Sequence, residues 1–244
     1  MQTRLMRAVL AQTRVELTLT LRRGESVLLA LGIPVLLLVF FSTVDVGFIE
    51  HGDRVDFVAP GVLALAVMST AMVGLGIATG FERQYGVLKR LGASPLGRPA
   101  LLAAKTLSIL AVEMLQVGVL VVVAFLLGWD PAGSALAAGL AMLLATVGFA
   151  GVGLLMAGTM RGELVLAAAN GLYLVLLLLG GMVIPLAKLP ALARGVARLL
   201  PAAALSDALH DVFAAAHVPA RAWAVLVVWA VAAPLVAALT FRWE

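Results

Sequence analysis

The sequence lacks cysteine altogether and has few charged residues, 12% of its 244 positions. Without cysteine there can be no disulfide and no thiolate metal or redox site. An ordinary soluble domain is about 45–50% apolar and roughly 25% charged, whereas 63% of this chain is hydrophobic and its mean hydropathy is +1.12. Because the apolar runs are long and do not alternate with polar residues, the sequence predicts an all-α integral membrane protein.

Several chemical motifs are also missing. The sequence contains no Gly-Lys dipeptide, so it has no Walker A loop to hold ATP phosphates, and ATP-driven work would need a separate polypeptide. A rhomboid-type protease is excluded because no serine motif is present and the three histidines, His51, His210 and His217, fall outside the apolar runs. No cluster of His, Asp and Glu has metal-ligand spacing. We therefore expect no catalytic residue, no bound cofactor and no metal in this chain.

Six apolar segments, each near the roughly 20 residues that cross a bilayer, divide the chain. The first is short and contains Pro34, which predicts a kink. We find no internal repeat and no second domain, so residues 1–244 are expected to form one transmembrane domain. The predicted spans are 27–44, 57–80, 106–127, 134–159, 164–184 and 222–241.

Lysine and arginine are distributed unevenly between the two sides that these spans define. Twelve lie on the side of the two termini and five on the other, which predicts cytoplasmic termini. This pattern is typical of membrane topology and argues against nucleic-acid binding. Residues 1–24 combine a leucine-rich face with Arg4, Arg7 and Arg14, which predicts an interfacial helix on an anionic leaflet. We do not expect a signal peptide, because the first apolar run begins only after Arg23.

The longest polar stretch between spans covers residues 81–105, and the turn residues in it predict a cytoplasmic loop over 82–99. Tyr85, Leu88 and Leu91 recur at helical spacing among charged residues, which predicts a short amphipathic helix followed by a turn. Such a helix can lie on anionic lipid or be held by a soluble partner. We favour the soluble partner.

Glu113 is the one carboxylate well inside a predicted span, about 12 Å beyond Lys105 at a rise of 1.5 Å per residue. Gln116 lies on the same helical face, and Asn170 is a weaker case in the fifth span. These residues are candidates for the lining of a translocation path. The alternative is that they form hydrogen bonds between helices.

Small residues at close-approach sites, such as Gly76 and Gly80, can pack within one subunit or between two.

The segment 185–220 is predicted to lie outside, although it is rich in alanine and leucine. Prolines divide it into pieces too short to span a bilayer. We expect two short helices, 189–200 and 202–216, which dip into the outer leaflet or cap the pore.

Two stretches resemble conserved parts of the permease subunits of type-2 ABC exporters, the class of the daunorubicin-resistance pumps. In the first, Glu82-Arg83 precedes a run from Gly86 to Leu91 and then Ser94-Pro95-Leu96, as in the cytoplasmic loop of that family. In the second, residues 181–185 are followed by Leu189-Pro190, Leu200-Pro201 and Asp207. Val87 replaces the usual threonine, His210 replaces a residue that is often basic, and the aromatic residue usual after Pro201 is missing.

The resemblance implies a dimer of permeases, formed by two copies or by a copy and a paralogue, on a dimer of ATPase subunits that carry ATP and Mg²⁺. The loop helix would be the coupling helix, seated in a groove of the ATPase, and the outside helices would gate the exit. The implied ATPase-coupling residues are Glu82, Arg83, Tyr85, Gly86, Leu88, Lys89, Arg90, Leu91 and Pro95. The candidates for the path are Glu113, Gln116 and Asn170, and those for the exit gate are Pro185, Pro190, Pro201 and Asp207.

The function we expect is export of an amphipathic drug, lipid or glycolipid-like substrate, with multidrug resistance as one outcome. The residue usage, rich in alanine, valine, leucine, arginine and glycine, points to the plasma membrane of a bacterium with a GC-rich genome. An ion-coupled secondary transporter is an alternative, but it usually needs several intramembrane charges and an internal repeat. A membrane scaffold without an ATPase partner is the other alternative.

Overall fold

The computed structural model describes residues 2–22, 24–44, 54–92, 98–182, 186–216 and 218–242, and the regular structure within these ranges is entirely helical. The all-α fold class is therefore confirmed. The helices are α1 (Gln2–Arg22), α2 (Gly24–Thr43), α3 (Arg54–Met68), η1 (Ser69–Gly74), α4 (Leu75–Gln84), α5 (Val87–Gly92), α6 (Arg98–Leu126), α7 (Ala135–Thr159), α8 (Gly162–Leu179), η2 (Leu186–Lys188), α9 (Ala191–Ala197), α10 (Pro201–Phe213) and α11 (Ala220–Thr240).

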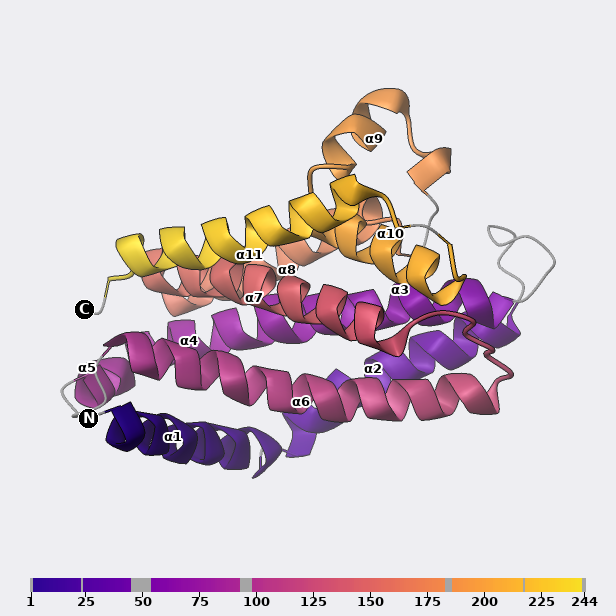
Figure 1. Ribbon diagram of the computed structural model, residues 1–244. Helices are drawn as coiled ribbons and strands as arrows, with labels where there is room; N and C mark the ends of the chain where they lie inside the picture. The colour runs from indigo at the N-terminus through magenta and orange to yellow at the C-terminus, as the bar shows by residue number, and fades with distance from the viewer. Residues whose placement is uncertain are drawn as a thin grey trace.

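Five helices within the described residues are long and apolar enough to cross a membrane: Arg54–Gln84, Ala100–Leu126, Ala135–Thr159, Gly162–Leu179 and Ala220–Thr240. They correspond to the last five predicted spans. The first predicted span corresponds to α2, which contains Pro34. Its apolar part, Ala30–Thr43, is shorter than the other five spans. Figure 1 shows the long helices running along one common direction as a bundle.

Helix α7 packs at the centre of this bundle, against α11, α4, α10 and η1. Its glycines allow the close approach. A Cβ on Gly151 would lie 2.4 Å from the backbone nitrogen of Pro234 in α11, and one on Gly153 would lie 2.6 Å from the carbonyl oxygen of Met72 in η1. These two small residues are therefore used for packing within one chain.

Two helices extend further into the predicted loop of residues 82–99 than we expected. The second span continues to Gln84 instead of ending at Gly80, and it includes a six-residue π segment, η1. It ends only where Gly86 takes a φ of +71°, a left-handed conformation that favours glycine. Helix α6 begins at Arg98 instead of residue 106, because a proline at position 99 is compatible with the first turn of a helix.

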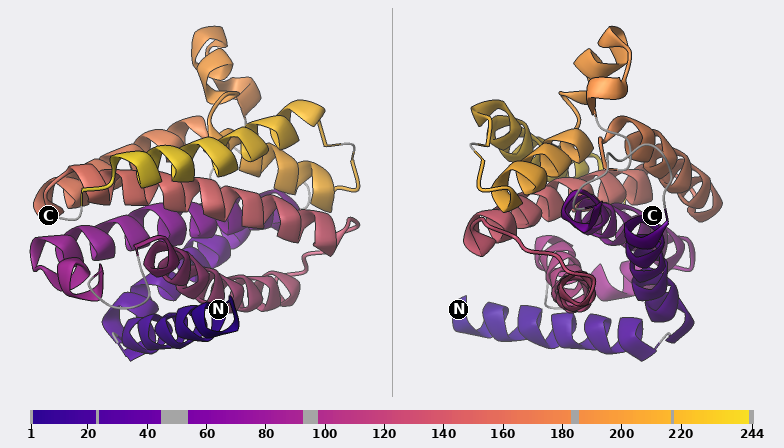
Figure 2. Two further views of the ribbon diagram at one scale, coloured as in Figure 1. Left: turned by 60° about the vertical axis from the view of Figure 1, so that its left-hand side comes forward. Right: turned by 90° about the vertical axis from the view of Figure 1, so that its right-hand side faces the viewer.

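Helix α1 lies across the bundle at one end. The right-hand view of Figure 2 looks along α6 and shows α1 lengthwise beneath it, and the two helices are in contact. The beginning of α1, the end of α11 and α5 all lie at the same end of the bundle in Figure 1. The two termini are thus on the same side of the protein.

The two predicted short helices of 189–200 and 202–216 are shorter in the structure and differ in environment. Helix α10 is mostly buried and packs against α3, α7 and α11. Helix α9 stands away from the bundle in all three views, and its Leu192 is 84% exposed. Of these two helices, α9 lies at the periphery of the fold and α10 lies inside it.

Candidate functional site

We expected the predicted cytoplasmic loop to form one coupling helix over residues 82–91. The structure instead divides these residues between two helices. Glu82 and Arg83 belong to the last turn of α4, and the chain turns at Tyr85 and Gly86 before α5 begins. The break gives α4 and α5 different orientations. The residues that were expected to form one contact surface therefore face in different directions.

Leu88 of α5 is completely buried, and it packs with Leu101 of α6 and Phe241 beyond the end of α11. Tyr85, by contrast, is 69% exposed, and Lys89 is also exposed. Leu88 thus fixes α5 to the bundle. Lys89 of α5 and Tyr85 in the turn before it are exposed on the surface. Among the other predicted coupling residues, Pro95 lies outside the described residues, as do the side chains of Arg90 and Leu91.

Arg83 is partly exposed, and its side chain reaches the end of α7. Its guanidinium donates to the carbonyl oxygens of Gly158, of Met160 at 2.8 Å and of Arg242 at 3.2 Å. The last carbonyls of a helix have no partner within that helix and carry partial negative charge, so a guanidinium stabilises them. Arg83 therefore joins α4 to α7 and to the end of the chain.

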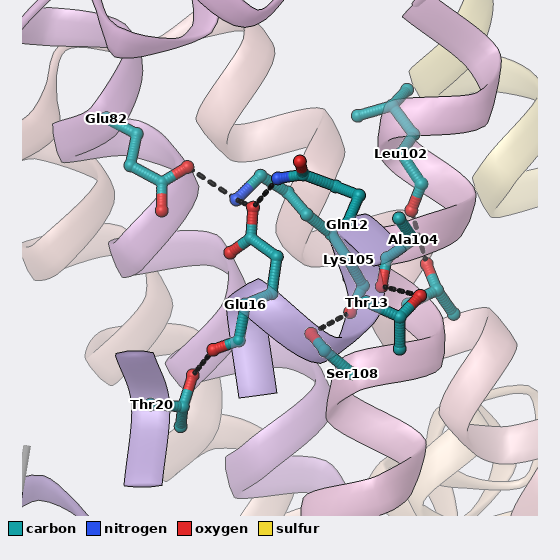
Figure 3. Close-up of polar contacts among 10 residues, drawn as sticks. Gln12, Thr13, Glu16, Thr20, Glu82, Leu102, Ala104, Lys105 and Ser108 are labelled. Atoms are coloured by element: carbon teal, nitrogen blue, oxygen red, sulfur yellow. Dashed lines mark hydrogen bonds and ion pairs between the residues drawn. The ribbon is translucent and has the colours of Figure 1, made fainter. Parts of the chain in front are cut away.

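Lys105 of α6 is 2% exposed and forms ion pairs with two carboxylates (Figure 3). Its Nζ lies 3.1 Å from Glu16 of α1 and 2.5 Å from Glu82 of α4. Gln12 donates a further hydrogen bond of 2.9 Å to Glu16. Because a buried charge is costly unless it is paired, this cluster fixes three helices in one arrangement.

The Lys105 cluster was not predicted from the sequence, because Lys105 was expected in the loop and Glu82 was expected to contact the ATPase. One feature could have indicated it. Glu16 is the single acid of the basic segment 1–24, and it lies on the same helical face as Val9 and Thr13. An acid on the inner face of a basic helix favours a buried cationic partner.

The polar residues inside the bundle connect helices. Glu113 is 4% exposed, and its Oε2 accepts a hydrogen bond of 2.6 Å from Thr146 of α7, while within the described part of the protein its Oε1 has no partner. Gln116 accepts from Thr70 of η1 at 2.9 Å and donates to the carbonyl oxygen of Ala30 in α2 at 2.6 Å. Helix α6 is thereby bonded to α7, η1 and α2.

Asn170 is not brought together with these residues. Its side chain is exposed on α8 and donates to the carbonyl oxygen of Leu166, one turn earlier.

At the opposite end of the bundle, Asp207 of α10 pairs with Arg221 of α11 at 2.9 Å. Burial raises the pKa of the Asp207 carboxyl above its ordinary value, and Arg221 opposes this shift. Pro201 is the buried first residue of α10, and Pro190 is exposed just before α9. Pro185 lies outside the described residues.

A model of the ABC-2 type transporter family matches residues 7–214. This match covers most of the chain, including residues 82–99, the buried polar residues and α10. The chain therefore belongs to the ABC-2 type transporter family and is a multi-pass transmembrane permease of that class. No curated protein matches it significantly. The match ends one residue after α10, so the matched residues do not include α11.

Proposed function

We propose that this chain is the membrane subunit of an exporter that moves an amphipathic substrate out of the cytoplasm, driven by ATP hydrolysis in a separate subunit. The observation that supports the proposal best is the division of α5 into two sides. Leu88 is buried against the bundle, whereas Tyr85 and Lys89 are exposed beside it. A short helix held from one side and exposed on the other is suited to docking in a groove of a partner.

The contacts behind α5 suggest how movement of the ATPase would reach the spans. Leu88 would transmit it to α6 and to the end of α11, and Arg83 would transmit it from α4 to the end of α7. The Lys105 cluster would carry the same movement to α1. We expect α1, α4, α5 and the cytoplasmic end of α6 to move together.

An amphipathic substrate suits the composition of the bundle. Its helices are strongly apolar, and the buried polar groups are concentrated on α6 near Glu113 and Gln116. We propose that Glu113 meets the polar part of the substrate, because its Oε1 is buried without a partner in the described residues. Helix α10 would control the exit. The functional unit would contain two permease copies, or a copy and a paralogue, in a bacterial plasma membrane with cytoplasmic termini.

Purification of the tagged protein from its own membranes in mild detergent tests the proposal. We expect an ATPase with a Walker A motif to co-purify in equal amount. The double variant Tyr85→Ala/Lys89→Ala should release this ATPase while lowering the thermal midpoint of the permease less than Leu88→Ala does, because Leu88 is completely buried and the other two side chains are exposed. The matched control Arg198→Ala, an exposed position at the other end of the bundle, should retain the ATPase. Isolation of the wild type without any ATPase would contradict the proposal, as would transport that persists after ATP depletion but stops with a proton uncoupler. The latter result would favour a secondary transporter.

A further inference from the structure

The last described residues of the chain are part of the surface on which α5 rests. Phe241 follows α11 and is 8% exposed. It packs against Leu88 of α5 and Leu101 of α6 in a small apolar cluster separate from the main core. Gly158 of α7 makes room for this ring, since a Cβ there would lie 2.5 Å from Cδ2 of Phe241.

The backbone beside Phe241 is also fixed. The amide of Arg242 donates to the carbonyl oxygen of Gly158 at 3.1 Å. The carbonyl oxygen of Arg242 accepts from the guanidinium of Arg83 at 3.2 Å. The end of the chain is thus held by α4 and α7, and it presents one aromatic ring to α5.

The first half of α11 contacts α10 and the residues that follow α9. Arg221 pairs with Asp207 of α10 at 2.9 Å, and the indole of Trp229 donates to the carbonyl oxygen of Leu199, just after α9, at 3.0 Å. Between its two ends, α11 packs along α7. One helix therefore connects the neighbourhood of α5 with that of α10.

We propose that Phe241 is a positioning residue for the ATPase contact: it fixes α5 through Leu88 and connects its position to α11, and through α11 to α10. This inference rests on the proposed function, and it extends that function to a segment that lies beyond the family match. Phe241 is not itself expected to contact the ATPase, because its side chain is buried beneath α5.

A single spin label on α5 tests the inference directly. The chain has no cysteine, so a cysteine introduced at Val87, which is 39% exposed, carries the label alone. In the purified full-length permease in nanodiscs, Phe241→Ala should increase the mobility of the label. Phe241→Leu should restore much of the wild-type spectrum, because it keeps an apolar side chain against Leu88. Leu239→Ala is the matched control, since Leu239 is 78% exposed in the last turn of α11.

The complex with the ATPase gives the second measurement. Phe241→Ala should reduce the amount of retained ATPase several-fold, while Phe241→Leu and Leu239→Ala should retain it. If Phe241→Ala does not fold, Leu88→Ala removes the same contact from the other side and should give the same increase in mobility. A label that is as immobile in Phe241→Ala or Leu88→Ala as in the wild type would overturn the inference. Because the spin-label measurement needs no ATPase, it is independent of the proposed function, which fails instead if the wild type binds no ATPase.

Discussion

Lys105 of α6 holds Glu16 of α1 at 3.1 Å, across 89 residues of sequence. The same ammonium contacts Glu82 at the end of α4, so one buried cation joins the crosswise helix α1 to two bundle helices. The position of α1 is therefore set by an electrostatic contact inside the protein, in addition to any contact with lipid.

Substitution of Lys105 by methionine should be strongly destabilising. It would leave the carboxylates of Glu16 and Glu82, whose side chains are 13% and 22% exposed, without their cation. Loss of one partner of a fully buried ion pair costs about 3–5 kcal/mol, and the partial exposure of these carboxylates places the expected loss near the lower end of that range. The thermal midpoint of the detergent-solubilised protein measures this loss. The triple variant with Glu16→Gln and Glu82→Gln should recover much of the stability, and Lys188→Met, at an exposed lysine, is the control. An unchanged midpoint for Lys105→Met would show that the cluster contributes little.

Glu113→Gln should leave the fold intact and change transport. The amide oxygen of glutamine can still accept the hydrogen bond of Thr146, but the side chain can no longer gain or lose a proton. ATP-dependent uptake of a fluorescent amphipathic dye into inverted vesicles measures the effect. Thr146→Val is the comparison: it should lower stability by about 1–3 kcal/mol, because a buried acceptor loses its donor. If Glu113→Gln transports at the wild-type rate, Glu113 only connects helices.

Gly151→Ala should separate α7 from α11. Its Cβ would lie 2.4 Å from the backbone nitrogen of Pro234, and overpacking of this kind typically costs about 1–3 kcal/mol. Gly139→Ala, in the same helix but with no atom within 4 Å, should instead raise stability by up to about 1 kcal/mol through helix propensity. Thermal midpoints of the two variants should therefore move in opposite directions, and a parallel shift would show that α7 and α11 can move apart freely.

Asp207 of α10 should make the stability of the folded protein depend on pH. Its pKa is raised in the folded protein, so the native state binds this proton more tightly than the unfolded state. As the pH falls through the raised pKa of the folded state toward the ordinary value of 3.8, the wild type should gain stability relative to Asp207→Asn. Arg221→Gln removes the cation that opposes the shift, so the gain should begin at a higher pH. A difference that stays constant with pH would contradict the assignment.

The apolar segments were sufficient to predict the helical class and the order of the spans, because burial in lipid needs about 20 apolar residues whatever the partner helices are. The ends of the helices were not predicted as well. Glu82, Arg83 and Lys105 are polar and look like loop residues in the sequence, yet they lie on helices. Glu82 and Lys105 pair with each other, and Arg83 bonds to carbonyl oxygens at the end of α7.

The candidate site was predicted only in outline. Spacing placed Leu88 and Tyr85 on one amphipathic helix, but only the left-handed turn at Gly86 and the contact with Phe241 decide that Leu88 faces inward while Tyr85 faces outward. Phe241 is more than a hundred residues away from α5 in the sequence, and a lone aromatic residue after an apolar run gives no indication of such a contact.

The two sides of α5 are subject to different requirements in evolution. A change at Leu88 disturbs the interior of the protein, so it must be matched by changes at Leu101 or Phe241. Tyr85, Val87 and Lys89 are exposed and do not belong to either apolar cluster. After a gene duplication, substitutions at these exposed positions alone can change which ATPase the permease recognises. The packing of the membrane bundle need not change.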